Sequence, residues 1–196
     1  VVGSDLEIIS KSNAKAIRTL DHNIDGTVNV VNNGGYTNVV GNYTITLVAS
    51  NDTGATGTIQ ITVVPDNTVA IGDTHYITAD DYNILAKDVS GTDAEILTKT
   101  NAKSWSLDTH LEDGQVNVKN NGGYNATVGI YTIDLVSDKD ANAIGTAISR
   151  VLPNDTIAIG NTHYITANDF TIKASAVASD NNQIIEKSNA TVHKLE

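Results

Sequence analysis

The stretch Asn32-Asn33-Gly34-Gly35-Tyr36 is followed by Gly41-Asn42-Tyr43-Thr44-Ile45, and both return as Asn120-Asn121-Gly122-Gly123-Tyr124 and Gly129-Ile130-Tyr131-Thr132-Ile133. The two copies lie 88 residues apart, since 120 − 32 and 129 − 41 agree, and Pro65 and Pro153 keep the same offset. A period of this length is too long for a solenoid repeat, and it suits a small domain with its own core. The sequence therefore predicts an 88-residue repeat that is used at least twice.

Regular alternation of apolar and polar residues follows each Gly-Gly loop. Tyr43, Ile45 and Leu47 share one side of the first copy, and the second copy has Tyr131, Ile133 and Leu135 there. A period of two residues indicates a half-buried strand, so we expect Tyr43 and Tyr131 to be buried with their hydroxyls hydrogen-bonded. A partner strand is expected over 58–64 and 146–152. Ala147 and Ser149 replace two isoleucines of the first copy, which predicts a smaller core or a different strand pairing there.

Three capping boxes indicate that each repeat has one short helix. In this motif a side chain caps the first turn while the residue three positions later returns to the backbone of the cap. The three versions are Ser4-Asp5-Leu6-Glu7, Thr92-Asp93-Ala94-Glu95 and Asp180-Asn181-Asn182-Gln183. Each helix is expected to end near an asparagine, because Asn tolerates the left-handed backbone that closes a helix. These asparagines are Asn13, Asn101 and Asn189.

The region between Pro65 and the second helix predicts two short strands with a change of face between them. Ile77 and Ala79 have odd numbers, whereas Tyr82 and Ile84 have even numbers. The inward face therefore slips by one residue near Asp80-Asp81, as a bulge or a break would require.

Two ways of dividing the chain remain open. Counting from the first residue gives modules at 1–88 and 89–176, with 177–196 as the start of a third repeat. Counting from the prolines gives an incomplete unit at 1–65, a complete one at 66–153, and the opening part of the next at 154–196. The first is favoured, because consecutive elements are usually neighbours in space. The second predicts head-to-tail self-association by strand exchange, because an incomplete sandwich exposes a strand edge.

Composition narrows the classes of partner. Asp and Glu number 23 against 12 Lys and Arg, which gives a formal charge of −11 and disfavours nucleic acid as a partner. The chain has no cysteine, so disulfides and thiolate metal sites are excluded. No apolar run approaches the length that crosses a bilayer, so membrane insertion is not expected.

The sequence carries no motif that predicts catalysis. A phosphate loop, a nucleophile elbow and a zinc-protease helix are all missing, and the five histidines lack metal-ligand spacing. We therefore predict that the protein is not an enzyme, that it has no catalytic residues, and that it requires no cofactor, with calcium as the one weak candidate.

Two weak ligand sites are considered. Asp138, Asp140 and Asn142 alternate as oxygen ligands for calcium would, although no glutamate follows at the EF-hand position, so a polar turn is the preferred interpretation. Tyr36, Tyr124 and Asn121 lie in the Asn-Gly loops, where an aromatic ring and an amide could hold a glycan. These loops are the basis of an alternative function as a lectin-like module.

A family resemblance rests on three short motifs. They are Ile165-Thr166-Ala167-Asn168-Asp169-Phe170-Thr171-Ile172, the helix ending in Asn101-Ala102-Lys103-Ser104-Trp105, and the Tyr131-Thr132-Ile133 strand that follows Gly129. In this order they resemble tandem bacterial Ig-like repeats from the stalks of Gram-positive cell-surface adhesins. The resemblance implies an all-β fold of tandem Ig-like β-sandwich modules, each with one short helix.

The same resemblance implies a non-catalytic, extracellular stalk or adhesion module on the bacterial cell surface, acting as a spacer. The expected partners are other modules of the same protein, a host or cell-surface protein or glycan, and further copies of the chain.

Overall fold

The computed structural model describes residues 3–178 and 180–195. Strands hold 42% of the residues and helices 16%, and most strands pair in antiparallel sheets, so the fold belongs to the all-β class. The chain divides into two compact units. One holds the residues up to Thr68 together with Ser106–Leu111, and the other holds Val69–Trp105 and the residues from Glu112 onward.

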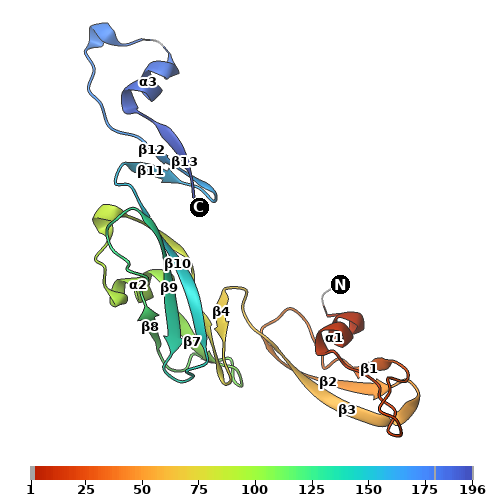
Figure 1. Cartoon of the computed structure of the whole chain (residues 1–196). Helices are drawn as coiled ribbons and strands as arrows, with labels where there is room; N and C mark the ends of the chain where they lie inside the picture. The colour runs from red at the N-terminus through yellow and green to blue at the C-terminus, as the bar shows by residue number, and fades with distance from the viewer. Residues whose placement is uncertain (1–2, 179, 196) are drawn as a thin grey trace. The chain divides into compact units, whose positions relative to one another are not determined.

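The N-terminal sheet has three antiparallel strands in the order β1-β2-β3, covered by one helix (Figure 1). Its elements are α1 (Asp5–Ser12), β1 (Val28–Asn32), β2 (Gly41–Ala49) and β3 (Asp52–Val63). Ile8 of α1 packs with Ile45 of β2 and with Tyr36 to form a small core. This order leaves β3 at one edge of the sheet.

The middle sandwich consists of two sheets that share one core. Its elements are β4 (Thr68–Ile71), β5 (His75–Thr78), β6 (Tyr82–Leu85), η1 (Ala86–Asp88), α2 (Asp93–Thr100), β7 (Lys103–Ser106), β8 (Val116–Asn120), β9 (Gly129–Ser137) and β10 (Ile144–Leu152). The strand orders are β4-β5-β7 and β6-β10-β9-β8. Side chains from both sheets and from α2 meet in the core, including Ile77, Ile96 and Ile133, each with no exposed surface.

The predicted break near Asp80-Asp81 is confirmed, and it moves the chain from one sheet to the other. β5 ends at Thr78 and β6 begins at Tyr82. β6 then pairs in parallel with β10, with Tyr82 opposite Ser149 and Ile84 opposite Val151. The sandwich therefore extends across residue 88.

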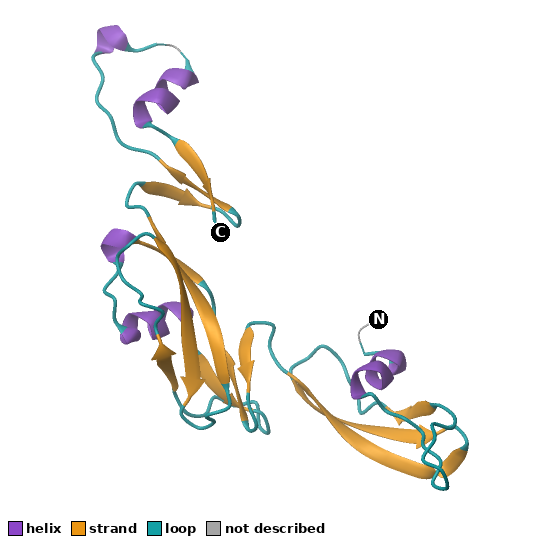
Figure 2. Ribbon diagram, viewed as in Figure 1, coloured by secondary structure: helices purple, strands orange, loops and turns teal. Residues whose placement is uncertain are grey.

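The C-terminal sheet has the order β11-β12-β13. Its elements are β11 (Thr156–Ile159), β12 (His163–Thr166), η2 (Ala174–Ala176), α3 (Asn181–Ser188) and β13 (Thr191–Lys194). Residues 167–173, which follow β12, form a loop without regular structure (Figure 2). In the middle sandwich, the residues 88 positions earlier include β6.

All three predicted helices form with the predicted caps. The side chains of Ser4, Thr92 and Asp180 each accept a hydrogen bond from the backbone three residues later. Each helix closes on an asparagine in the left-handed region, at Asn13 (φ 51°), Asn101 (φ 49°) and Asn189 (φ 50°). The caps satisfy backbone groups that the helix leaves unpaired, so these short helices are encoded locally.

The predicted hydrogen bonds of the Tyr43 and Tyr131 hydroxyls form, but the prediction that both side chains are buried is wrong. Their hydroxyls donate to the carbonyls of Val39 and Thr127, each at 2.8 Å, but both side chains are only half-buried. The reason is that each ring packs edge-on against a tyrosine of the preceding loop, and that loop residue takes the interior position.

Candidate functional site

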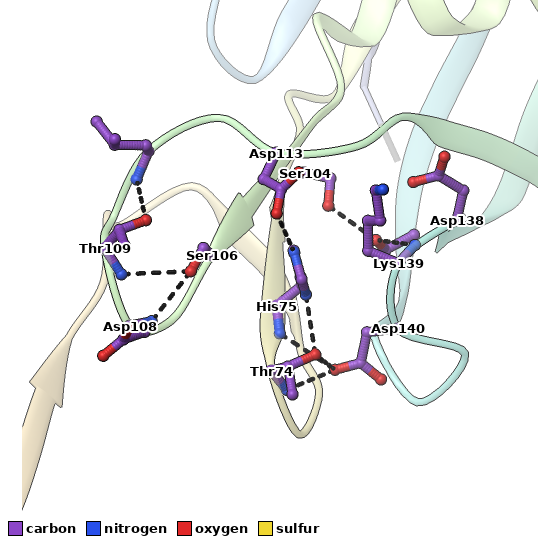
Figure 3. A network of polar contacts seen from close by, with 12 residues as sticks. Thr74, His75, Ser104, Ser106, Asp108, Thr109, Asp113, Asp138, Lys139 and Asp140 are labelled. Atoms are coloured by element: carbon purple, nitrogen blue, oxygen red, sulfur yellow. Dashed lines mark hydrogen bonds and ion pairs between the residues drawn. The ribbon is translucent and has the colours of Figure 1, made fainter.

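A buried carboxylate joins the two sheets of the middle sandwich. Asp140 lies between β9 and β10 and is 7% exposed. Its Oδ2 accepts hydrogen bonds from the backbone of Thr74 (2.7 Å) and His75 (3.1 Å; Figure 3). Its Oδ1 accepts one from the backbone of Asn142 (3.0 Å). Because Thr74 ends the β4–β5 turn and His75 begins β5, this carboxylate connects that turn of one sheet to the β9–β10 turn of the other. We call Thr74, His75 and Asp140 the Asp140 cluster.

These donors change the acidity of Asp140. The hydrogen bond from the Thr74 backbone, with those from Asn142 and His75, holds the pKa of Asp140 well below its ordinary value, although burial opposes the shift. A carboxyl whose pKa is lower in the folded state stabilises the fold above its unfolded pKa. That stabilisation is lost as the pH falls toward the folded pKa. At neutral pH, Asp140 is therefore an ionised clamp between the sheets.

Neighbouring polar groups extend the cluster. His75 Nδ1 lies 2.9 Å from Thr74 Oγ1, and His75 Nε2 lies 3.2 Å from Asp113 Oδ2. The Ser104 and Ser137 hydroxyls meet at 2.8 Å, which adds a second buried link between the sheets. The polar atoms of this region thus bind one another, as buried polar groups must.

The three residues of the calcium hypothesis are directed at different protein groups. Asp138 Oδ1 accepts from the backbone of Gln115 at 2.8 Å, and Asn142 Nδ2 donates to Asp73 at 2.7 Å. Asp140 is occupied by the N–H donors described above. Over the described part of the chain, no three His, Cys, Asp or Glu side chains gather as metal ligands would. Calcium takes six to eight oxygen ligands, so the geometry here fits a hydrogen-bonded clamp and offers no cage for the ion.

The residues of the glycan hypothesis lie mostly inside the protein. Tyr36 is 9% exposed and Tyr124 is 4% exposed. Their hydroxyls donate to Glu7 and Glu95 respectively, each at 3.3 Å, and burial raises the pKa of Tyr124. Asn121 Oδ1 is used within the loop, where it accepts from the backbone of Gly123 at 3.0 Å. A sugar stacks on an exposed aromatic face, and these two rings expose little of theirs.

The role of Asp140 as a clamp was not predicted, although the repeat contained a signal for it. Asp52 and Asp140 are 88 residues apart, as are the histidines His75 and His163. Repetition marks both residues as part of the repeated structure, but the contact uses the backbone N–H of His75 and not its side chain. Periodicity alone could not show this, because it describes only the face of one strand.

A second candidate site is the open side of the N-terminal sheet. A groove of about 600 Å³ runs along it, and among its lining residues are Ala16, Val28, Leu47, Ala55 and Gly57. On β3, Ile59, Ile61 and Val63 are partly exposed. The residues 88 positions later are Ala147, Ser149 and Val151, and all three are buried in the middle sandwich.

Comparisons with protein-family models, with curated proteins and with solved structures found no match to this chain. Within residues 3–178 and 180–195, no helix has the length and apolar character needed to cross a membrane.

Proposed function

We propose that the chain is a non-catalytic stalk or adhesion segment of a bacterial cell-surface protein, in which tandem Ig-like β-sandwich modules act as extracellular spacers. The observation that carries this proposal is the parallel pairing of β6 with β10 in the middle sandwich. A spacer has to transmit tension along its chain without unfolding, and this pairing is suited to that task.

The direction of the two strands determines how tension acts on them. Tension reaches β10 from its C-terminal end, and it reaches β6 from its N-terminal side once β4 and β5 have come away. Since the two strands are parallel, with Tyr82 opposite Ser149 and Leu85 opposite Leu152, the forces pull them past one another. All four residue pairs then resist the tension at the same time. An antiparallel hairpin pulled at its open end would instead separate one pair at a time.

Side-chain contacts reinforce the same ladder. Asp81, just before β6, accepts a hydrogen bond from the backbone of Ile148 at 2.8 Å and lies 3.6 Å from Arg150. Beyond β6, the backbone of Lys87 donates to Asn154 Oδ1 at 2.7 Å. These contacts hold both ends of β6 against β10 and the residues that follow it, so they support a role for β6 in resisting tension.

Single-molecule stretching of the full chain tests the proposal. We expect residues 82–152, which lie between the start of β6 and the end of β10, to unfold in one high-force event that releases roughly 240 Å of chain, at about 3.4 Å per residue. Asp81→Ala should lower the rupture force, because β6 loses its anchor on β10. Thr146→Ala is the matched control, because Thr146 lies exposed on β10 and should leave the force unchanged.

Two results would contradict the spacer function. One is gradual unzipping of the middle sandwich at low force. The other is specific binding on a glycan array that is lost on Tyr36→Ala and Tyr124→Ala while both variants remain folded, which would favour the lectin-like alternative; the check on folding is needed because both rings are buried.

A further inference from the structure

Each Gly-rich loop of the repeat contains an asparagine followed directly by a glycine. These pairs are Asn33-Gly34 and Asn121-Gly122, and no other asparagine of the chain precedes a glycine. The pair is chemically reactive, because glycine has no side chain to shield its backbone nitrogen from the amide carbon of the asparagine. Both glycines are exposed, so water reaches them in the folded protein. Solvent access therefore does not limit the reaction, and the geometry of the loops decides whether it occurs.

We propose that Asn33 and Asn121 are sites of deamidation, which the folded loops prevent and which unfolding permits. The backbone nitrogen of the following glycine gives up its proton and attacks Cγ of the asparagine. A new C–N bond closes a succinimide ring, while the side-chain nitrogen takes up that proton and leaves as ammonia. Water then opens the ring, so the net change is the loss of ammonia and the gain of water. This modification goes beyond the spacer function and depends on neither a partner nor a location.

The attacking nitrogen is held in its unreactive form in both loops. The backbone N–H of Gly122 donates a hydrogen bond to Asn120 Oδ1 at 3.0 Å, and that of Gly34 donates to Asn32 Oδ1 at 2.9 Å. The nitrogen has to lose this hydrogen before it can attack. Because a hydrogen bond donated by the neutral N–H favours the protonated form, the neighbouring asparagine keeps the nucleophile inactive.

The amide that would be attacked is held as well. Asn121 Oδ1 accepts a hydrogen bond from the backbone of Gly123 at 3.0 Å, and Asn33 Oδ1 accepts one from the backbone of Gly35 at 3.0 Å. Bonds of this kind between an asparagine side chain and the backbone two residues on are common in turns. Ring closure changes the torsion angles of the asparagine side chain and backbone. The reaction therefore has to break this bond too.

The backbone of the second loop has no room to adjust. Gly122 has a φ of 62°, and a Cβ there would collide with the backbone oxygen of Thr132 in β9. The turn is closed by a hydrogen bond from the backbone of Tyr124 to the carbonyl oxygen of Asn121, at 3.0 Å. Gly122 thus cannot rotate into the ring geometry while the turn lies against β9.

The core of the middle sandwich fixes this turn in place. Tyr124 is 4% exposed, and its hydroxyl donates to Glu95 at 3.3 Å. Its ring packs edge-on against the rings of Tyr82 and Tyr131. The loop can therefore open only if Tyr124 leaves the core. Local opening is then as costly as disrupting that packing, which couples the reactivity of the loop to the stability of the sandwich.

The first loop makes the same set of contacts in the N-terminal sheet. The backbone of Tyr36 donates to the carbonyl oxygen of Asn33 at 2.9 Å. Gly34 has a φ of 59°, and a Cβ there would collide with the backbone oxygen of Thr44. The Tyr36 hydroxyl donates to Glu7 at 3.3 Å. The chain thus contains two independent examples of the same protected site.

The two products of the reaction affect the turn differently. Opening the ring at Cγ gives aspartate, which still has an oxygen for the backbone of Gly123. Opening it at the original main-chain carbonyl gives isoaspartate, whose main chain is one carbon longer. The carbonyl that accepted the hydrogen bond from Tyr124 then belongs to a free carboxylate. A chain that has stayed unfolded long enough to form isoaspartate at position 121 therefore cannot rebuild the same turn.

Peptide mapping by mass spectrometry on the full chain tests the proposal. One sample is kept folded and another is kept unfolded in guanidinium chloride, at the same pH and temperature. We expect deamidation at Asn33 and Asn121 to be more than about tenfold slower in the folded sample, because the reaction waits for the loop to open. Chromatography separates aspartate from isoaspartate in each peptide.

Substitution of the asparagine before each site tests the contact that holds the nitrogen. Asn120→Ala removes the acceptor of the Gly122 N–H, and it should speed deamidation of Asn121 in the folded chain about fivefold, the factor that one ordinary hydrogen bond represents. Asn33 in the same molecule is the matched control and should react as slowly as before. Asn32→Ala should have the converse effect.

A conservative variant separates the hydrogen bond from a general loosening of the loop. Asn120→Asp keeps an oxygen acceptor and should leave Asn121 protected, while Trp105 fluorescence shows that each variant is folded. The proposal is overturned if either site reacts as fast in the folded chain as in the unfolded one, or if neither reacts when unfolded. It is equally overturned if Asn120→Ala leaves Asn121 unchanged, or if Asn120→Asp reacts as fast as Asn120→Ala.

Discussion

The middle sandwich and the two flanking sheets, β1-β2-β3 and β11-β12-β13, are built from the same repeated sequence. They differ in how far they bury equivalent residues. The helix residue Ile96 of the middle sandwich has no exposed surface, and its equivalent Ile8 is 1% exposed. The third equivalent, Ile184, is 56% exposed. All three helices form, so the local sequence is sufficient for the helix. Burial depends on whether a sheet lies beneath the helix, and within residues 3–178 and 180–195 strands equivalent to β8 and β9 are present for α1 and α2.

The two long sheets differ in the same way on the inward faces of their interior strands β9 and β2. Leu135 of β9 is fully buried, whereas its equivalent Leu47 of β2 is only partly buried. The difference comes from β4 and β5, which cover that face in the middle sandwich. A strand can thus have the correct sequence, register and partners within its sheet and still lack the second layer that closes a core.

The largest difference in stability between the middle sandwich and the C-terminal sheet is expected when the equivalent isoleucine of each helix is truncated. Ile96→Ala should destabilise the middle sandwich by about 3 kcal/mol, since it removes buried groups from a packed core. The matched change Ile184→Ala should cost less than about 0.5 kcal/mol, because the side chain is mostly exposed. Urea unfolding followed by the fluorescence of Trp105, the single tryptophan, measures the first effect. Amide hydrogen exchange in α3 measures the second. Equal costs at the two positions would contradict the contrast in burial.

A smaller effect is expected from the buried carboxylate. Asp140→Asn should destabilise the middle sandwich by about 2 kcal/mol, because hydrogen bonds to a charged acceptor are lost. Asp52→Asn should have almost no effect on stability, because Asp52, the residue of the N-terminal sheet equivalent to Asp140, is exposed. Trp105 fluorescence again reports the middle sandwich.

The pH dependence of stability gives a further test of the role of Asp140. The lowered pKa of Asp140 means that its stabilisation is present above the unfolded pKa, about 3.9, and declines as the pH falls below that value. The parent should therefore lose stability between neutral and acidic pH faster than Asp140→Asn does. Parallel stability curves for the two proteins would show that Asp140 is not the clamp.

The smallest effect is expected at the helix caps. Thr92→Ala should cost the middle sandwich about 1 kcal/mol, because the backbone of Glu95 loses its hydrogen bond to the cap. Asp180→Ala should instead loosen α3 alone, and the stability of the middle sandwich should stay unchanged. Hydrogen exchange resolves the two helices. Loss of protection in α2 on Asp180→Ala would show that the helices are coupled.

Much of this architecture could be predicted from the sequence because it depends on neighbouring residues. A cap and its partner are three positions apart, as in Thr92 and Glu95, so a capping box is visible in the sequence. The break between β5 and β6 was equally visible, because the inward face changes parity there. The 88-residue offset is a property of the sequence itself.

The roles of Tyr124 and Asp140 depended instead on residues far along the chain. Tyr124 lies in a Gly-rich loop, whose sequence predicts an exposed position. It is buried because Tyr82 and Glu95 lie against it. Asp140 reads as part of a polar turn, yet it binds the backbone of residues more than sixty positions earlier.

The sequence by itself determined the 88-residue repeat, which is visible in the order of the residues. It also determined the three capped helices, the alternating strands and the all-β class, because these depend on residues a few positions apart. Only the tertiary structure decided that β6 pairs in parallel with β10 and that Asp140 clamps the two sheets. A parallel pair cannot be joined by a tight turn, so its partner lies far along the chain. The alternation of a strand specifies which side chains face inward, but it does not specify which strand lies beside it.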